Sequence, residues 1–185
     1  MANNKEQLIK SIEEFLASDE KCMLITGTHQ YEKHIAAMAM LNRCMPNSKI
    51  LFRINAMQNI SGDSFLGKYI SKKPKAGEKF RIGKNIYEAD SFNTKNSWSK
   101  TSHQFDAAIL YPIDAIARRD VKMDCVEDLF IHKQISKIFL ISWTDHNNYD
   151  YSIFDKYVDR CVVYDAEEED IEYHKRVLDI VKNKI

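Results

Sequence analysis

Residues 22–34 form the one stretch of this sequence in which residue types and spacing together predict a binding site. An apolar run ends at Gly27, Thr28 and His29 follow it, and Lys33 comes six positions after the glycine. A glycine turn at the start of a helix directs backbone N–H groups toward an anion, and a lysine ammonium adds a full positive charge. We therefore expect Gly27, Thr28, His29 and Lys33 to form an anion- or phosphate-binding loop.

Polar residues also follow the later apolar runs of the chain. Asp114 comes shortly after a run that ends at Tyr111, and Asp145 and His146 follow a run that ends near Trp143. Ligands of open parallel sheets bind beyond the carboxyl ends of the strands, so Asp114, Asp145 and His146 are candidate catalytic residues. The acids would hold a metal ion or a proton. Turns and helix caps use the same residue types, so a structural role stays open as an alternative.

A third candidate site is the basic segment 68–100, which has nine Lys and Arg against three Asp and Glu, although the whole chain has 27 of each. A net charge of zero argues against a wholly basic nucleic-acid binder, but a local basic segment can still contact phosphates. Trp98 could stack a base. The alternatives are a solvated lysine-rich loop and aromatic residues that fix the hairpin to the sheet. The candidate nucleic-acid-binding residues are Lys72, Lys73, Lys75, Lys79, Arg81, Lys84 and Trp98.

Length and composition restrict the class of protein. A chain of 185 residues with 44% hydrophobic and 29% charged residues is long enough for one folded domain and too apolar for a disordered one. The four cysteines form no CxxC pair, and we expect no metal site. The first residues lack the apolar core of a signal peptide, and no apolar run is long enough to span a membrane. We expect a soluble, cytoplasmic protein that does not associate with membranes.

The candidate residues require an alternation of strands and helices. Continuous apolar runs predict buried strands, and 3.6-residue periodicity predicts helices between them. We expect a single α/β domain, a three-layer α/β/α sandwich with a mostly parallel sheet of about five strands. Residues 68–104 would form an inserted basic hairpin, with strands at 79–82 and 86–90. The predicted strands cover 22–25, 49–54, 107–111, 137–143 and 160–164, and the predicted helices 5–18, 30–44, a short one after Ser61, 113–133, 151–159 and 167–183.

The first strand–turn–helix unit resembles the phosphate loop of P-loop NTPases of the RecA- and helicase-like kind, with Gly27 and Lys33 at the matching spacing. The runs at 105–111 and 137–145 are similar in order to the strands that follow in that family. The chain departs from the pattern at Glu32 in place of the second glycine, at His34 in place of the magnesium-binding Ser or Thr, and at Pro112 in place of an acid. The resemblance therefore implies a degenerate member that does not hydrolyse ATP, and we predict no ATP, magnesium or other cofactor.

These observations lead to three hypotheses about function. The first is a P-loop-like domain without hydrolytic activity that binds nucleic acid, or a nucleic-acid-processing protein, through the basic hairpin. The second is an enzyme with its site at the strand ends, such as a metal-dependent nuclease or a phosphate-ester hydrolase. The third is a structural subunit whose acidic C-terminal half contacts a basic partner. We favour a binding protein over an enzyme.

Overall fold

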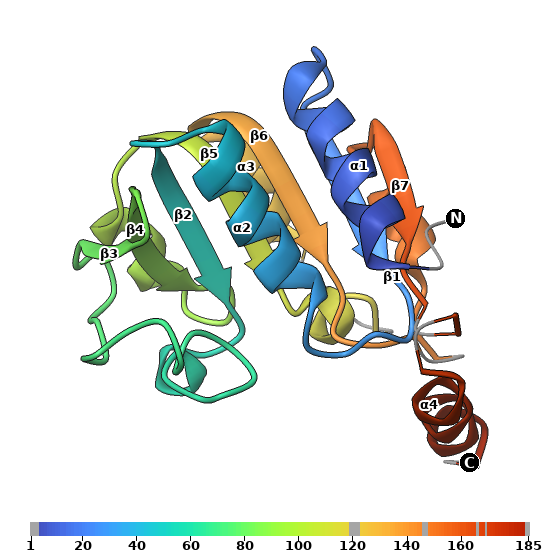
Figure 1. Ribbon diagram of the computed structural model, residues 1–185. Coiled ribbons are helices and arrows are strands. Elements are labelled where there is room, and N and C mark those ends of the chain that lie inside the picture. The colour runs from blue at the N-terminus through green and yellow to red at the C-terminus, as the bar shows by residue number, and fades with distance from the viewer. Residues whose placement is uncertain (1–3, 119–122, 146–147, 166, 169, 184–185) are drawn as a thin grey trace.

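The computed structural model describes residues 4–118, 123–145, 148–165, 167–168 and 170–183 (Figure 1). Within these residues, seven strands form one sheet in the order β3-β4-β2-β5-β6-β1-β7. Every neighbouring pair is parallel except the β3–β4 hairpin, which is antiparallel. The strands are β1 (Cys22–Thr26), β2 (Lys49–Ile54), β3 (Phe80–Ile82), β4 (Asn85–Ser91), β5 (Gln104–Tyr111), β6 (Gln134–Ile141) and β7 (Arg160–Val163).

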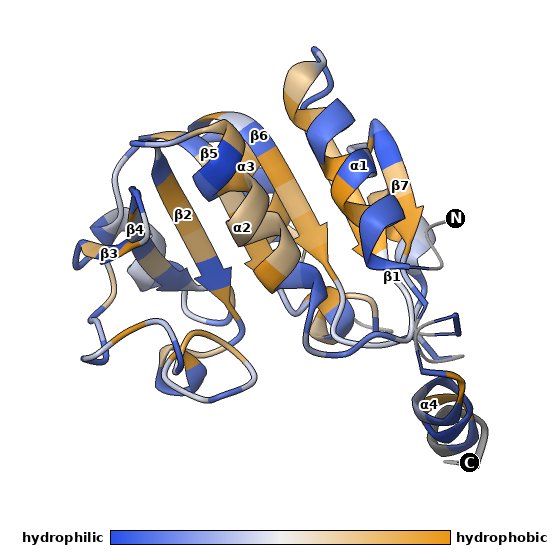
Figure 2. Cartoon of the chain, in the orientation of Figure 1, coloured by the Kyte–Doolittle hydropathy of each residue, from blue (hydrophilic) through white to orange (hydrophobic). Residues whose placement is uncertain are grey.

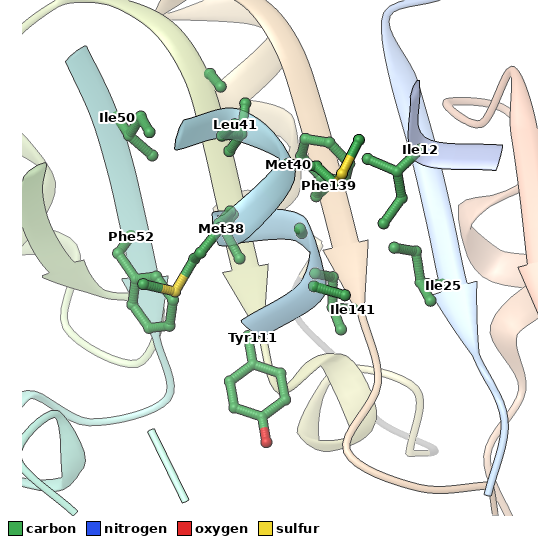
Figure 3. Packing of buried hydrophobic residues seen from close by; sticks show 14 of the residues in the cluster. Ile12, Ile25, Met38, Met40, Leu41, Ile50, Phe52, Tyr111, Phe139 and Ile141 are labelled. Atoms are coloured by element: carbon green, nitrogen blue, oxygen red, sulfur yellow. The ribbon is translucent and has the colours of Figure 1, made fainter. Parts of the chain in front are cut away.

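Helices lie against both faces of the sheet. On one face, α1 (Lys5–Ala17) and α2 (Lys33–Cys44) bury apolar side chains against alternate strand residues such as Met23 and Ile25. Figure 3 shows Met38 and Leu41 of α2 among Phe52, Tyr111 and Phe139. On the other face, α3 (Asp124–Ile131) packs against strand residues such as Leu24. The inner strands β1, β2, β5 and β6 are buried along most of their length on both sides, which explains their nearly continuous apolar sequences (Figure 2).

The structure confirms a mostly parallel α/β sheet and changes the strand count. The five predicted parallel strands all form. The predicted hairpin also forms, but β4 pairs with β2 along its length, from Lys49 with Ile86 to Ile54 with Ser91. Both hairpin strands therefore join the main sheet, which has seven strands among the described residues where about five were expected.

Three predicted helices are interrupted, reduced to a 3₁₀ turn or absent, and the helices expected to begin at 30 and 167 begin at 33 and 171. The helix expected over 113–133 is replaced by a 3₁₀ turn (Ile113–Ala115) and α3, with residues 119–122 outside the described part. The helix expected over 151–159 is a 3₁₀ turn (Tyr151–Phe154). No helix forms after Ser61. The chain turns tightly there: the N–H of Gly67 donates to the carbonyl oxygen of Gly62 at 3.1 Å, and a Cβ at Gly67 would lie 2.4 Å from the Ser61 carbonyl oxygen.

The last helix, α4 (Ile171–Asn183), lies beyond the carboxyl ends of β1 and β7, away from the body of the sheet (Figure 1). In the part of the chain that the structure describes, no helix combines the length and apolar character needed to cross a membrane.

Candidate functional site

The loop after β1 is built around a glycine that no other residue can replace. Gly27 has a φ of +115°, and a Cβ added there would lie 2.1 Å from the backbone oxygen of Tyr164. Both the backbone angle and the space therefore require glycine. The close approach brings the loop against the end of β7.

Successive backbone N–H groups of this loop already donate to acceptors of the chain itself. Two of the acceptors are carboxylates that follow β6 and β7. The hydrogen bonds run from Gly27 N to Asp145 Oδ1 (3.0 Å), from Thr28 N to Asp165 Oδ1 (2.9 Å), from His29 N to the Tyr164 carbonyl oxygen (3.4 Å) and from Gln30 N to the Tyr173 hydroxyl (3.0 Å). The positions in which a phosphate would accept are thus taken by the protein's own oxygens.

Lys33 lies inside the same loop and is fully buried. Its ammonium donates to the carbonyl oxygens of Gly27 at 2.7 Å, His29 at 2.5 Å and Trp143 at 3.0 Å. Three acceptors use all three N–H donors of a lysine ammonium. Burial lowers the pKa of Lys33 to about 8, against the opposing attraction of Asp145, Asp114 and Asp165. In this arrangement Lys33 balances nearby carboxylates and holds the loop closed.

The predicted catalytic acids lie close to this loop, where they accept backbone hydrogen bonds. Asp114 accepts from the N–H of Trp143 at 2.5 Å and from that of Thr144 at 3.0 Å, so it fixes the chain just after β6. Burial raises the pKa of Asp114 and that of Asp145, and the N–H donors partly oppose the change. His146 lies outside the described residues. Within the described ranges, no group of three or more His, Cys, Asp and Glu side chains could hold a metal ion.

Sequence analysis did not identify the contact between α4 and the loop. The Nδ1 of His174 lies 2.9 Å from the hydroxyl of Thr28, and the ring centroid of His29 lies 5.6 Å from that of Tyr173. These partners are more than 130 residues apart in the chain, so no local pattern could reveal them.

The predicted basic residues all lie on the surface, at the β3 edge of the sheet and in the loop that precedes it. Lys72 pairs with Glu78 at 3.4 Å, and a guanidinium nitrogen of Arg81 donates to the Lys84 carbonyl oxygen at 3.2 Å. The other acids of the basic segment are buried: Glu88 is 1% exposed and Asp90 is fully buried. The surface of this segment is therefore more positive than its composition indicates. All nine basic residues of the segment are exposed; seven lie in 68–84 and two follow the hairpin: Lys68, Lys72, Lys73, Lys75, Lys79, Arg81, Lys84, Lys95 and Lys100.

Trp98 has internal partners, and Lys95 of the basic segment lies 6.0 Å from its ring centroid. Its indole N–H donates to the carbonyl oxygen of Ser91 at 2.8 Å, and its ring covers the buried guanidinium of Arg53 at 4.8 Å from the ring centroid. Two other aromatic residues of the segment, Phe80 and Tyr87, stack on each other at 5.8 Å, and Tyr87 is buried. These contacts favour the alternative in which the aromatic residues fix the hairpin and its flanking loop to the sheet.

The geometry of Gly27 gives a direct test of the loop. Gly27→Ala should lower the free energy of unfolding by more than about 1 kcal/mol, because an alanine is strained at this φ and its Cβ meets backbone atoms. Urea denaturation of the variant against the wild type measures the loss. Gly62→Ala is the matched control, since Gly62 has no positive φ and its nearest contact would be 3.1 Å. Equal stability of the two variants would contradict the tight packing of the loop.

We compared the chain with known proteins by family model, by sequence and by structure. No family model matches it, and no curated protein and no solved structure matches it significantly.

Proposed function

We propose that this chain is a P-loop-like domain without hydrolytic activity that binds nucleic acid through the basic surface of residues 68–84. One observation is the main support: seven Lys and Arg side chains are exposed on this segment, and Glu78 is its only acid. Such a local excess of cations attracts phosphates even when the whole chain is neutral. A protein partner that processes nucleic acid would use the same surface.

The state of the loop after β1 supports the absence of nucleotide hydrolysis. Its N–H groups and the Lys33 ammonium are engaged within the protein. His34, in the position expected for a magnesium-binding hydroxyl, is buried and stacks on Tyr111 at 4.1 Å. Glu32, in place of a second glycine, pairs with Lys5 at 2.8 Å. A nucleotide would have to displace these contacts before it could bind.

The proposal includes a three-layer arrangement of helices and sheet. Helices α1 and α2 on one face and α3 on the other support a three-layer α/β/α arrangement. A location in the cytoplasm stays a prediction.

Fluorescence anisotropy with a labelled single strand tests the binding surface. We expect binding whose logarithmic affinity falls with the logarithm of salt concentration, by about 0.7 for each phosphate contacted. The triple variant Lys72→Glu, Lys73→Glu and Lys75→Glu should bind weakly and should reduce the slope by ~2. The matched control reverses three exposed lysines elsewhere, Lys10, Lys156 and Lys175, and should bind nearly as the wild type does.

Two outcomes would contradict the proposal. One is the absence of binding by the wild type at low salt. The other is an equal loss of affinity in the two triple variants, because that would show an effect of net charge without a defined surface.

A further inference from the structure

A pocket of about 380 Å³ lies between α1, α2 and the segment 63–69. Its volume falls within the range of small-molecule sites. Apolar side chains of the two helices, Ile9, Ile35 and Met40, line part of it, and Tyr31 and Tyr69 line it as well. Tyr31 and Glu32 come from the end of the loop after β1, but the backbone N–H groups of residues 27–30 of that loop are engaged elsewhere and do not line the pocket.

The tyrosines of this pocket are exposed to an unusual degree for aromatic side chains. Tyr31 is 46% exposed and Tyr69 is 44% exposed. Trp143, which is 37% exposed, lies with its ring centroid 6.2 Å from that of Tyr31. Among the described residues, these are the three large aromatic side chains with high exposure, and two of them line one pocket. Accessible aromatic faces beside an apolar wall fit a flat ring that stacks.

The charges of the lining favour a neutral group inside the pocket. Lys5 pairs with Glu32 at 2.8 Å, and the remaining charged lining residues are Asp63 and Lys68. The two cations and two anions balance, so a phosphate gains little by entering. Lys68 and Tyr69, however, begin the basic segment, and Lys72 and Lys73 follow three and four positions after Tyr69. A strand could therefore place its phosphates on the lysines and a base in the adjoining pocket.

We propose that this pocket takes an unpaired base of a nucleic-acid strand, which stacks on Tyr69 and Tyr31. The inference rests on the proposed function, since the lysines supply the phosphate contacts. Bases within a duplex are stacked and paired, and they cannot enter a side pocket without being extruded. The protein therefore prefers single strands, and the preference comes from the tyrosines.

The test compares a labelled single strand with an abasic strand of equal length, so that phosphates are kept and bases are removed. Tyr69→Ala should weaken binding of the normal strand by roughly 5- to 150-fold, the range for loss of one base–aromatic stack. Tyr69→Phe keeps the ring and should bind as the wild type does. Tyr31→Ala and Tyr31→Phe should behave in the same way. Binding of the abasic strand should be weaker in the wild type and unchanged by Tyr69→Ala.

Ile131→Ala is the control for loss of an exposed apolar side chain. Ile131 is 69% exposed at the end of α3, and this variant should bind as the wild type does. Thermal melts establish that each variant is folded. If Tyr31→Ala is destabilised because it loses the contact with Trp143, the affinity of Tyr69→Ala tests the pocket. Wild-type affinity of Tyr69→Ala for the normal strand, with binding still lost in the lysine triple variant, would overturn the pocket and leave the proposed function standing. Failure of the wild type to bind either strand would overturn both.

Discussion

Replacement of Arg53 by alanine is expected to lower the free energy of unfolding by about 3–5 kcal/mol, enough to unfold many domains of this size. Arg53 is fully buried, and its guanidinium pairs with Asp90 through two hydrogen bonds of 2.7 Å. It also donates to the Cys125 carbonyl oxygen at 2.8 Å and lies 2.8 Å from a carboxylate oxygen of Asp128. Without the guanidinium, two carboxylates would remain in the interior with their main cation removed.

Urea denaturation measures this effect, and Arg43→Ala is the matched control. Arg43 pairs with Glu13 at 2.7 Å, but both side chains are more than half exposed, so its loss should cost less than about 1 kcal/mol. A similar small loss for Arg53→Ala would contradict the buried network. The double variant Arg53→Met and Asp90→Leu should recover part of the stability, because it removes a charge together with its partner.

The second large expected effect is a loss of folding stability at low pH that is caused by His34. This side chain is 1% exposed, its Nε2–H donates to the Phe65 carbonyl oxygen at 3.3 Å, and within the described residues its Nδ1 has no hydrogen-bond partner. Burial lowers the pKa of His34 from 6.5 to about 4, and the charge of Lys33 adds to this effect. An added proton would place a charged N–H in the interior without an acceptor.

The sign of the pH dependence follows from the difference between the two states. Between pH 6.5 and about 4 the unfolded chain binds a proton at His34 that the folded chain does not, so stability falls as the pH falls. The stability of a fold that keeps His34 neutral is fully present above pH 6.5, and about 3 kcal/mol of the free energy of unfolding is lost by pH 4. His34→Phe keeps a ring against Tyr111 and cannot titrate.

Urea titrations near pH 7 and near pH 4 should therefore show a smaller loss of stability for His34→Phe than for the wild type. His132→Phe is the control, because His132 is exposed at the end of α3 and should leave the acid sensitivity unchanged. An equal loss in the wild type and in His34→Phe would show that His34 is not responsible.

The strands could be predicted because their signal is local. Runs such as 49–54 are apolar because both faces of a parallel strand are covered, and this requirement is visible in the sequence itself. The helices on the α3 face were less predictable. Periodicity continued through 113–133, but the chain there forms a 3₁₀ turn that presents Asp114 to the chain after β6. Tertiary hydrogen bonds of this kind override local propensity.

The candidate site was only partly predictable for the same reason. The glycine turn and its spacing selected Gly27 and Lys33, and the rule of strand ends selected Asp114 and Asp145. The structure brings all four together around one loop. It could not show that the carboxylates accept from the loop N–H groups, because such contacts depend on which strands are neighbours. Arg53 and Asp90 show the same limit: they lie opposite each other on β2 and β4, but 37 residues separate them in the chain.

The position of β3 at the edge of the sheet gives its basic residues a second consequence. An edge strand has unpaired backbone N–H and C=O groups that can recruit a strand from another molecule. β3 has only three residues, its central Arg81 is exposed, and Lys79 and Lys84 flank it. Charge and shortness both oppose strand addition, so these cations also protect the chain against self-association. Variants that remove them should therefore use Glu or Gln, because β-branched apolar replacements would create a surface prone to aggregation.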